Sequence, residues 1–344
     1  MKALLVLLAL CGTAFAQKAN HKWVYDTEGP MGTKITVFVW TDDEAKAVRA
    51  NKLVLDEIKR LDLLMTTWHR DGVPDGEVIQ INNAAGDHPV VVGDETYAVI
   101  ARAMDVSKRS GGVFDITVGG FKGLWKFDED NDQTIPDMAE VKKRLAVIGW
   151  QNIEMDPAKK TVFLKKKGMA ITLGGIAKGY AVDKASQKLK DAGYKSFIVQ
   201  AGGDMYVAGD KDGDPWTVAI RDPRGPEGSY FAGAPIKDHS FSTSGDYERF
   251  VIKNGVRYHH ILDPKTGMPA TASRSVTIRA TDAFTADAWS KVMFIDGPAL
   301  GMEVIKKEGL QDFEAVWVDK DNKVKMTSGI QQVLRILKEP SAGI

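Results

Sequence analysis

The stretch Leu173-Gly-Gly-Ile-Ala-Lys-Gly-Tyr-Ala-Val-Asp183 follows a short apolar run at residues 169–172 and opens an amphipathic segment that reaches about residue 192. This order predicts a strand, a glycine turn and a helix. Such a turn leaves backbone N–H groups free at a helix N-terminus, where the helix dipole also favours negative charge. We therefore expect a bound anion, first of all a phosphate, close to Lys178 in the first turn of the helix.

A second interpretation of the same residues stays open. Gly174 and Gly175 could serve only to let the chain turn, and Lys178 could be a solvated helix residue. A nucleotide-binding P-loop is excluded, because Lys178 is followed by Gly179 and not by serine or threonine.

The first 16 residues are expected to be a secretory signal peptide. Lys2 precedes an apolar run, and Ala14-Phe-Ala16 is a small-x-small cleavage pattern before Gln17. We therefore expect cleavage after Ala16 and export to the periplasm. Acylation of Cys11 is an alternative, but Leu10 is bulky at a position where lipoproteins usually carry a small residue.

Composition limits the remaining possibilities. Cys11 is the only cysteine, so the exported chain is expected to lack disulfides, a thiolate nucleophile and cysteine-bound metal. No later apolar stretch reaches the roughly 20 residues that a membrane-spanning helix needs, so we expect no such helix in the mature chain. The 46 basic and 46 acidic residues balance, so net charge does not indicate a nucleic-acid partner.

The order of elements predicts an α+β fold in one elaborated domain at residues 17–344, with mixed or antiparallel sheets flanked by helices, because strands and helices never alternate regularly. A strand is expected at residues 33–40, and a helix capped by Thr41 should run to about Met65. The pair Asn254-Gly255 between two strand-like runs predicts a hairpin with a type I′ turn. Other expected elements are a helix from Asp94 to before Gly111, strands at 113–117, 196–200, 216–221 and 275–280, a turn at 242–247, a helix at 284–295, a hairpin of 313–318 with 323–327, and a helical tail at 331–338.

Five polar residues are candidates for a site. Asp115 lies between Phe114 and Ile116, and a carboxylate in such an apolar setting needs backbone or ligand hydrogen bonds. His259 and His260 should face opposite sides of a strand, so at most one of them serves a given site. Asp287 lies one helical turn before Lys291, which suggests either a surface ion pair or a carboxylate metal ligand.

Eight sequence features occur in a fixed order along the chain. The features are Met31-Gly-Thr33; Met65-Thr-Thr-Trp68 with Asp75-Gly-Glu77 and Asn82; Phe114-Asp-Ile-Thr-Val-Gly119; residues 173–183; Ala201-Gly-Gly-Asp204; Thr243-Ser-Gly-Asp-Tyr247; His259-His-Ile-Leu-Asp-Pro264 with Thr266-Gly267; and Ala286-Asp287. Together they resemble the ApbE family of FAD:protein FMN transferases, also described as periplasmic flavin-trafficking proteins. The resemblance spans nearly the whole mature chain.

The resemblance implies an exported transferase that binds FAD and uses Mg²⁺ to split its phosphoanhydride. The FMN half would pass to a threonine hydroxyl of an acceptor protein, typically a membrane redox subunit, and AMP would leave. Two alternatives remain, because some relatives hydrolyse FAD to FMN and AMP and others hold FAD without turning it over.

The resemblance also implies roles for single residues. His260 is a candidate for assisting deprotonation of the acceptor hydroxyl. The metal would be held by the backbone carbonyl of Gly175, by Asp287 as principal carboxylate, and at the position of Lys291. The positions that match the FAD site are Met31, Met65, Thr66, Thr67, Val113, Phe114, Asp115, Thr172, Lys178 and Ile261.

Two residues depart from the family pattern. Thr172 stands where an acidic residue is usual, and Lys291 stands where a threonine is usual. A hydroxyl can ligate magnesium, whereas an ammonium group has no lone pair to offer. Lys291 therefore swings away, weakens metal binding by charge repulsion, or takes over part of the metal's electrostatic role.

Magnesium is expected to bind this chain more weakly than it binds a Lys291→Thr variant, because the variant removes a positive charge and supplies an oxygen ligand. Magnesium titrations of the two proteins check this expectation. Equal titration curves would contradict it.

Overall fold

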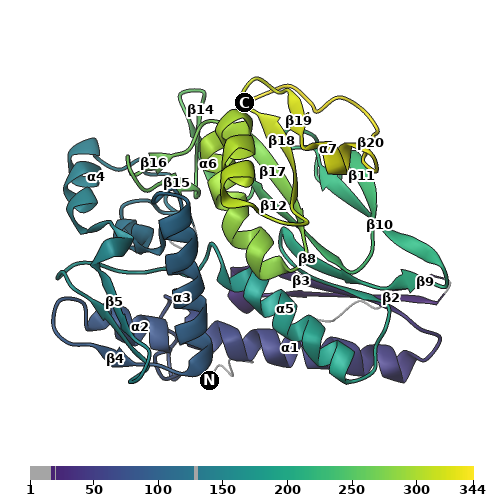
Figure 1. Ribbon diagram of the computed structural model, residues 1–344, viewed down its shortest axis with the longest axis horizontal. Coiled ribbons are helices and arrows are strands. Elements are labelled where there is room, and N and C mark those ends of the chain that lie inside the picture. Colours follow the sequence, from purple (N-terminus) through teal and green to yellow (C-terminus); the bar gives the residue numbers. More distant parts are fainter. Residues whose placement is uncertain (1–16, 20, 128–130) are drawn as a thin grey trace, which may run out of the picture.

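The computed structural model describes residues 17–19, 21–127 and 131–344 (Figure 1). The expected signal peptide, with Cys11 and Ala16, lies outside these residues. Within them, no helix combines the length and apolar character needed to cross a membrane.

A long antiparallel sheet organises the described part of the chain. Nine described strands form it in the order β1-β2-β3-β7-β8-β12-β17-β18-β19. Each neighbouring pair is antiparallel, which agrees with the α+β class expected from the sequence. The strands are β1 (Gln17–Ala19), β2 (Lys22–Glu28), β3 (Lys34–Trp40), β7 (Phe197–Ala201), β8 (Asp204–Ala208), β12 (His239–Gly245), β17 (Ser273–Ala280), β18 (Glu314–Asp319) and β19 (Val324–Met326).

The two faces of this sheet have different coverings. Helices α1 (Glu44–Met65), α5 (Ala177–Asp191) and α6 (Ala283–Glu308) cover one face, and a smaller sheet covers the other (Figure 1). In β18, Ala315 and Trp317 belong to the helix-side core, whereas Val316 and Val318 belong to the core beneath the smaller sheet. This alternation follows from the two-residue period of a strand. The smaller sheet has the order β20 (Arg335–Ile336), β11 (Tyr230–Ile236), β10 (Asp214–Arg221) and β9 (Asp210–Lys211).

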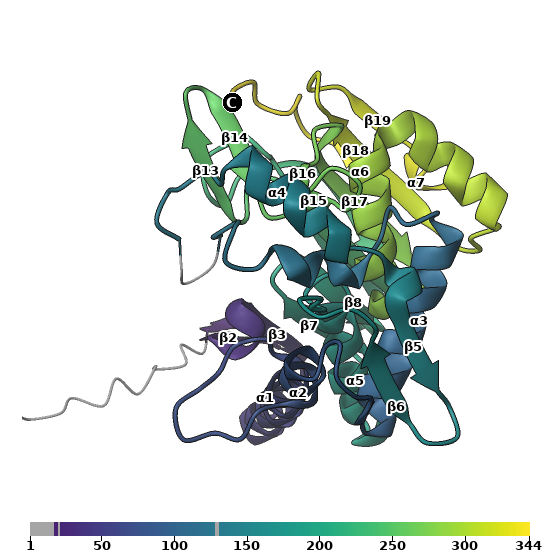
Figure 2. The same cartoon turned by 90° about the vertical axis from the view of Figure 1, so that its left-hand side faces the viewer.

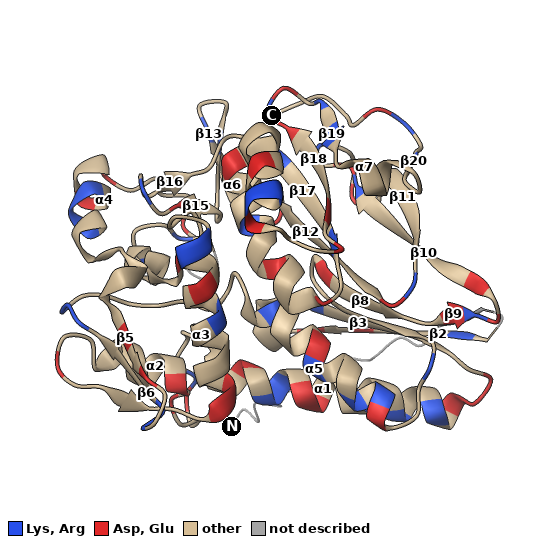
Figure 3. Cartoon of the chain, viewed as in Figure 1, with Lys and Arg blue, Asp and Glu red and all other residues tan. Residues whose placement is uncertain are grey.

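A third group of elements lies beside α6 and is drawn in blue and teal in Figures 1 and 2. It comprises α2 (Glu77–Asn83), α3 (Asp94–Arg109), α4 (Met138–Arg144) and the sheet β4-β6-β5, formed by Val90–Val91, Thr161–Leu164 and Ile153–Asp156. Basic and acidic residues are interspersed along α1, α3 and α6 (Figure 3), as expected for solvated helix faces. The remaining elements are the hairpins β13 (Phe250–Lys253) with β14 (Val256–His259) and β15 (Leu262–Asp263) with β16 (Met268–Pro269), the helix α7 (Ser328–Gln331), and the 3₁₀ turns η1 (Pro30–Gly32), η2 (Ile116–Phe121), η3 (Leu145–Val147) and η4 (Trp150–Asn152).

Local sequence signals place several elements correctly. The strand expected at residues 33–40 is β3, and the hairpin around Asn254-Gly255 is β13 with β14. Asn254 and Gly255 have φ angles of 53° and 74°, as a type I′ turn requires. The helix cap is one correction: Asp43, not Thr41, caps α1 by accepting a hydrogen bond from Lys46 N at 2.9 Å.

Four other segments differ from the expectations. Residues 113–117 form no strand, because Asp115 instead caps the 3₁₀ turn η2. Residues 169–172 join no sheet; the Asn82 side chain holds Ile171 through bonds of 2.7 and 2.9 Å to its backbone. The expected turn at 242–247 begins as strand β12, and the tail forms α7 and β20 in place of one helix.

Helix α6 is longer than the sequence suggests, and its start is fixed by two carboxylates. It continues past Gly297, whose φ of 71° marks a kink before Pro298. Asp282 accepts a bond from Thr285 N at 2.7 Å. Asp183 of α5 accepts bonds from the first two backbone N–H groups of α6, at 2.9 and 2.8 Å. The start of α6 is therefore tied to the middle of α5.

Candidate active site

The glycine stretch forms a turn at residues 174–176, and α5 begins at Ala177. The turn is closed by a bond from Ala177 N to Leu173 O at 2.8 Å, with Leu173 buried in the core. Thr172 supports it from outside, because its hydroxyl accepts a bond from Gly174 N at 3.3 Å. The helix start expected from the sequence is thus confirmed, although the strand before it is not.

Lys178 is not a solvated helix residue. Its Nζ lies 2.8 Å from Asp204 Oδ2, 3.6 Å from Asp287 Oδ1 and 3.4 Å from Gly174 O. Burial acts to lower the pKa of Lys178, but the charges of Asp204 and Asp287 outweigh it and raise this pKa above its ordinary value. The ammonium group therefore stays charged, with 21% of the side chain exposed.

Asp287 is fully buried and both its oxygens have partners. Oδ2 accepts a bond from Gly179 N at 2.9 Å, and Oδ1 accepts a bond from Lys291 Nζ. Burial opposes ionisation of Asp287, but Lys178 and Lys291 outweigh it, so the pKa lies below its ordinary value. The ion pair expected between Asp287 and Lys291 is thus present, but within the core and not on a helix surface.

Asp204 completes this group, although sequence reasoning gave it no individual role. It is 2% exposed, and its Oδ1 has no hydrogen-bond partner among the described residues. Burial, with the charge of Asp287, raises its pKa. The sequence signal that could have identified Asp204 is its position directly after Gly202-Gly203, at the start of a buried strand. We call Lys178, Asp204, Asp287 and Lys291 the charged cluster.

Gly175 and Phe114 lie beside the charged cluster. A Cβ placed on Gly175 would lie 3.3 Å from Phe114 Cε2 and 3.8 Å from both Cγ and Cε of Lys291. The loop of Val113 and Phe114 is tied to the same turn, because Thr172 N donates to Ile116 O at 2.8 Å. The structure therefore brings five of the expected site residues to one place: Gly175, Phe114, Lys178, Asp287 and Lys291.

Asp115 is used within its own loop. Its Oδ1 accepts bonds from Thr117 N and Oγ1 at 2.8 and 2.6 Å, and its Oδ2 accepts one from Trp150 N at 2.8 Å. Burial nevertheless raises its pKa. Of the two kinds of partner expected for this carboxylate, the structure provides the backbone groups, so Asp115 fixes the loop that carries Phe114.

His260 lies at a second wall of the site. His259 is buried and its Nε2 donates to Ala270 O at 2.8 Å, so the two histidines do face different surroundings. His260 Nδ1 is shielded from solvent and has no partner among the described residues. Arg249, which the sequence analysis did not single out, connects His260 to the 3₁₀ turn that contains Met31. Its backbone O accepts a bond from His260 N at 3.1 Å, and its Nη2 donates to Gly32 O at 2.7 Å. Ile261, expected at the FAD site, is buried beside His260.

The end of α1 carries three more expected residues. Met65 is buried, and the Thr66 hydroxyl accepts a bond from Trp68 N at 3.1 Å. Thr67 O accepts a bond from Lys122 Nζ, and the same ammonium group lies 4.0 Å from the centre of the Trp68 ring. Trp68 is half-buried and is not a core tryptophan. This segment therefore presents an aromatic face and hydroxyl groups near η2.

A sequence model described as the ApbE family matches residues 31–317. This chain belongs to the ApbE family. Among its relatives at 31% identity are two FAD:protein FMN transferases. The Klebsiella pneumoniae protein aligns over 87% of this chain and 90% of its own length, and the Treponema pallidum protein over 95% and 93%.

Solved ApbE structures have the same fold. The ApbE protein of Thermotoga maritima superposes with a TM-score of 0.81 at 32% identity, covering 91% of this chain and 99% of that one. The flavin transferase ApbE of Vibrio cholerae gives a TM-score of 0.75 at 26% identity, with coverage of 91% and 99%. The fold expected from the ApbE resemblance is therefore confirmed.

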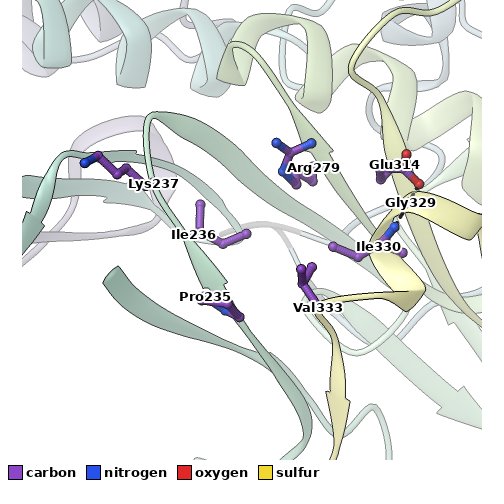
Figure 4. A pocket seen from close by; sticks show the side chains of 8 residues that line it. All are labelled: Pro235, Ile236, Lys237, Arg279, Glu314, Gly329, Ile330 and Val333. Carbon is purple, nitrogen blue, oxygen red and sulfur yellow. Dashed lines mark hydrogen bonds between the residues drawn. The ribbon is translucent and has the colours of Figure 1, made fainter. Parts of the chain in front are cut away.

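A pocket, shown in Figure 4, lies away from the charged cluster, between the smaller sheet and β18. Its polar groups already have partners within the fold: Arg279 bonds Asp312, and Glu314 accepts from Ile330 N. It offers an apolar surface with few free donors or acceptors, so the charged cluster is the better candidate for chemistry. Its lining residues are Pro235, Ile236, Lys237, Arg279, Glu314, Gly329, Ile330 and Val333.

Proposed function

We propose that this chain transfers FMN from FAD to a threonine hydroxyl of an acceptor protein and releases AMP. The observation that carries the proposal is the charged cluster at the glycine turn, where the ammonium groups of Lys178 and Lys291 are held in place by Asp204 and Asp287 at the position expected for the FAD pyrophosphate. The relatives from Klebsiella pneumoniae and Treponema pallidum, both FAD:protein FMN transferases, support it.

The proposed reaction is a phosphoryl transfer in which the protein mainly positions groups and neutralises charge. The threonine oxygen forms a bond to the FMN phosphorus, and the bond from that phosphorus to the bridging oxygen breaks. AMP leaves with the electron pair of that bond, and the hydroxyl proton passes to a base. The parts of FAD other than its pyrophosphate would contact the residues expected at the FAD site. These residues extend from the loop of Val113 and Phe114 to Met31, Ile261 and the end of α1.

His260 is the base that the geometry favours. Its Nδ1 has no partner among the described residues. Burial, followed by the charges of Arg249, His259, Lys291 and Lys178, holds the pKa of His260 well below its usual value of 6.5. The imidazole is therefore neutral near pH 7 and can accept a proton.

The pH dependence of transfer tests this assignment. Because the pKa of His260 is lowered, the neutral base persists as the pH falls through 6.5. The kcat/KM for the acceptor is therefore expected to stay constant between about pH 8 and about pH 6, and His260→Gln should lower it about a hundredfold. A rate that falls by half near pH 6.5, or a His260→Gln variant with unchanged rate, would contradict the assignment.

A periplasmic FAD-binding protein without turnover is the second candidate, and Lys291 at a metal-ligand position favours it. An FAD pyrophosphatase is the third, and it differs from the transferase only in that water attacks the phosphorus. We further propose that the chain acts in the periplasm after loss of its signal peptide, and that its acceptor is a membrane redox subunit.

AMP release distinguishes the three activities. The mature chain is incubated with FAD and Mg²⁺, with and without a peptide or domain that carries a flavinylation threonine. AMP formed only with the acceptor supports the transferase. AMP formed without it supports the pyrophosphatase, and an absence of AMP in both mixtures supports the binding protein.

A further inference from the structure

The charged cluster does not fit the magnesium site that the ApbE resemblance implies. Both oxygens of Asp287 are taken, one by Gly179 N and the other by Lys291 Nζ. The neighbouring carboxylate, Asp204, is paired with Lys178. Magnesium requires oxygen ligands in near-octahedral geometry. In the described part of the chain, no group of three or more His, Cys, Asp and Glu side chains could hold a metal ion.

Lys291 lies between the two groups expected to hold the metal. Its stem passes beside Gly175, with Cγ and Cε each 3.8 Å from the position of a Cβ there, and its ammonium group bonds Asp287. Asp287 lies one turn earlier on α6, so both side chains project from the same face of one rigid helix. The ammonium group therefore occupies the space between the Gly175 turn and the carboxylate.

Lys291 also has a donor left for a ligand. An ammonium group has three N–H donors, and Lys291 uses one on Asp287 and a long one, of 3.4 Å, on Ser290 Oγ. Lys178 differs, because three oxygens surround its Nζ within 3.6 Å. With 16% of its side chain exposed, Lys291 is both anchored and accessible.

We propose that the Lys291 ammonium is the resident cation of this site, so that it binds the FAD pyrophosphate directly and FAD binding needs no divalent metal. The inference rests on the proposed function for the identity of the ligand. An ammonium–phosphate bond is charge-assisted and strong in a partly buried site. Because Lys291 carries one charge and a divalent metal carries two, the bound pyrophosphate is less fully neutralised here than at a metal site.

Two substitutions separate this role from a metal-ligand role. Lys291→Thr removes the ammonium group and supplies a hydroxyl that can ligate magnesium, so FAD binding should weaken about tenfold in EDTA and recover when Mg²⁺ is added. Lys291→Met keeps an unbranched stem but offers neither a charge nor a hard ligand, so its weakened binding should not recover. Lys306→Thr is the matched control, because Lys306 is an exposed lysine near the end of the same helix.

The test measures FAD affinity by quenching of flavin fluorescence, in EDTA and in Mg²⁺, for the unsubstituted chain and the three variants. A calorimetric titration of Mg²⁺ alone gives a readout that needs no activity. We expect equal FAD affinity with and without metal for the unsubstituted chain and for Lys306→Thr, and heat of Mg²⁺ binding only for Lys291→Thr.

The comparison in the unsubstituted chain decides the inference even if a variant does not fold. FAD affinity that rises about tenfold with Mg²⁺ in that chain would overturn the inference and leave the proposed function standing. An absence of FAD binding in both EDTA and Mg²⁺ would overturn both.

Discussion

Replacing Gly179 by alanine is expected to lower the free energy of unfolding by about 3 kcal/mol and to abolish the candidate site. A Cβ at this position would lie 2.2 Å from Ala283 O and 2.7 Å from Asp287 Cβ, so α5 and α6 could not keep their present separation. Moving them apart would also break the bond from Gly179 N to Asp287 Oδ2. Urea unfolding of the purified variant measures the loss of stability.

Gly174→Ala is the matched control, because a Cβ there would meet only Thr172 Oγ1, at an ordinary contact distance of 3.5 Å. It should unfold at nearly the same urea concentration as the unsubstituted chain. If Gly179→Ala were as stable as Gly174→Ala, this would contradict the close approach of α5 and α6 at Gly179.

The second large effect is expected from Asp287→Asn. The amide can still accept the bond from Gly179 N, but Lys178 and Lys291 lose their shared carboxylate, and breaking a buried ion pair costs about 3 kcal/mol. Without this anchor, Lys291 no longer holds one position. A displacement of about 1 Å is enough to slow a reaction about a hundredfold, so AMP release with the acceptor should fall by that factor.

Asp296→Asn, further along α6, provides the control for Asp287→Asn. Asp296 is half-buried and lies outside the charged cluster, so its loss should change neither AMP release nor FAD affinity. Activity in Asp287→Asn equal to that of Asp296→Asn would show that the cluster does not hold the substrate.

Some parts of the fold could be predicted because their signals are local. The Asn254-Gly255 turn requires only two residues with positive φ, and the helix start after Gly174-Gly175 is visible within one short stretch. The strand expected at residues 113–117 failed because Asp115 makes hydrogen bonds to its own loop and to Trp150 N, a residue remote in sequence. Apolar pattern alone does not reveal such a competing partner.

The site could be predicted only in part, because its contacts also join residues that are remote in sequence. The one-turn spacing of Asp287 and Lys291 was compatible with an ion pair or with a metal ligand. Their contacts with Gly175 and Lys178 could not be predicted from helical spacing. Asp204 contacts Lys178, and Arg249 contacts Gly32. Both contacts join residues from different sequence motifs, so neither motif alone predicts them. The order of the nine strands in the large sheet is equally non-local.

The most direct test of the account is the intact mass of an acceptor domain after incubation with the mature chain and FAD. If FMN is transferred as proposed, the acceptor gains the mass of FMN less one water, the gain maps to one threonine, and one AMP forms for each flavin attached. AMP formation with an acceptor of unchanged mass would contradict transfer, as would an acceptor that keeps its mass while FAD remains intact.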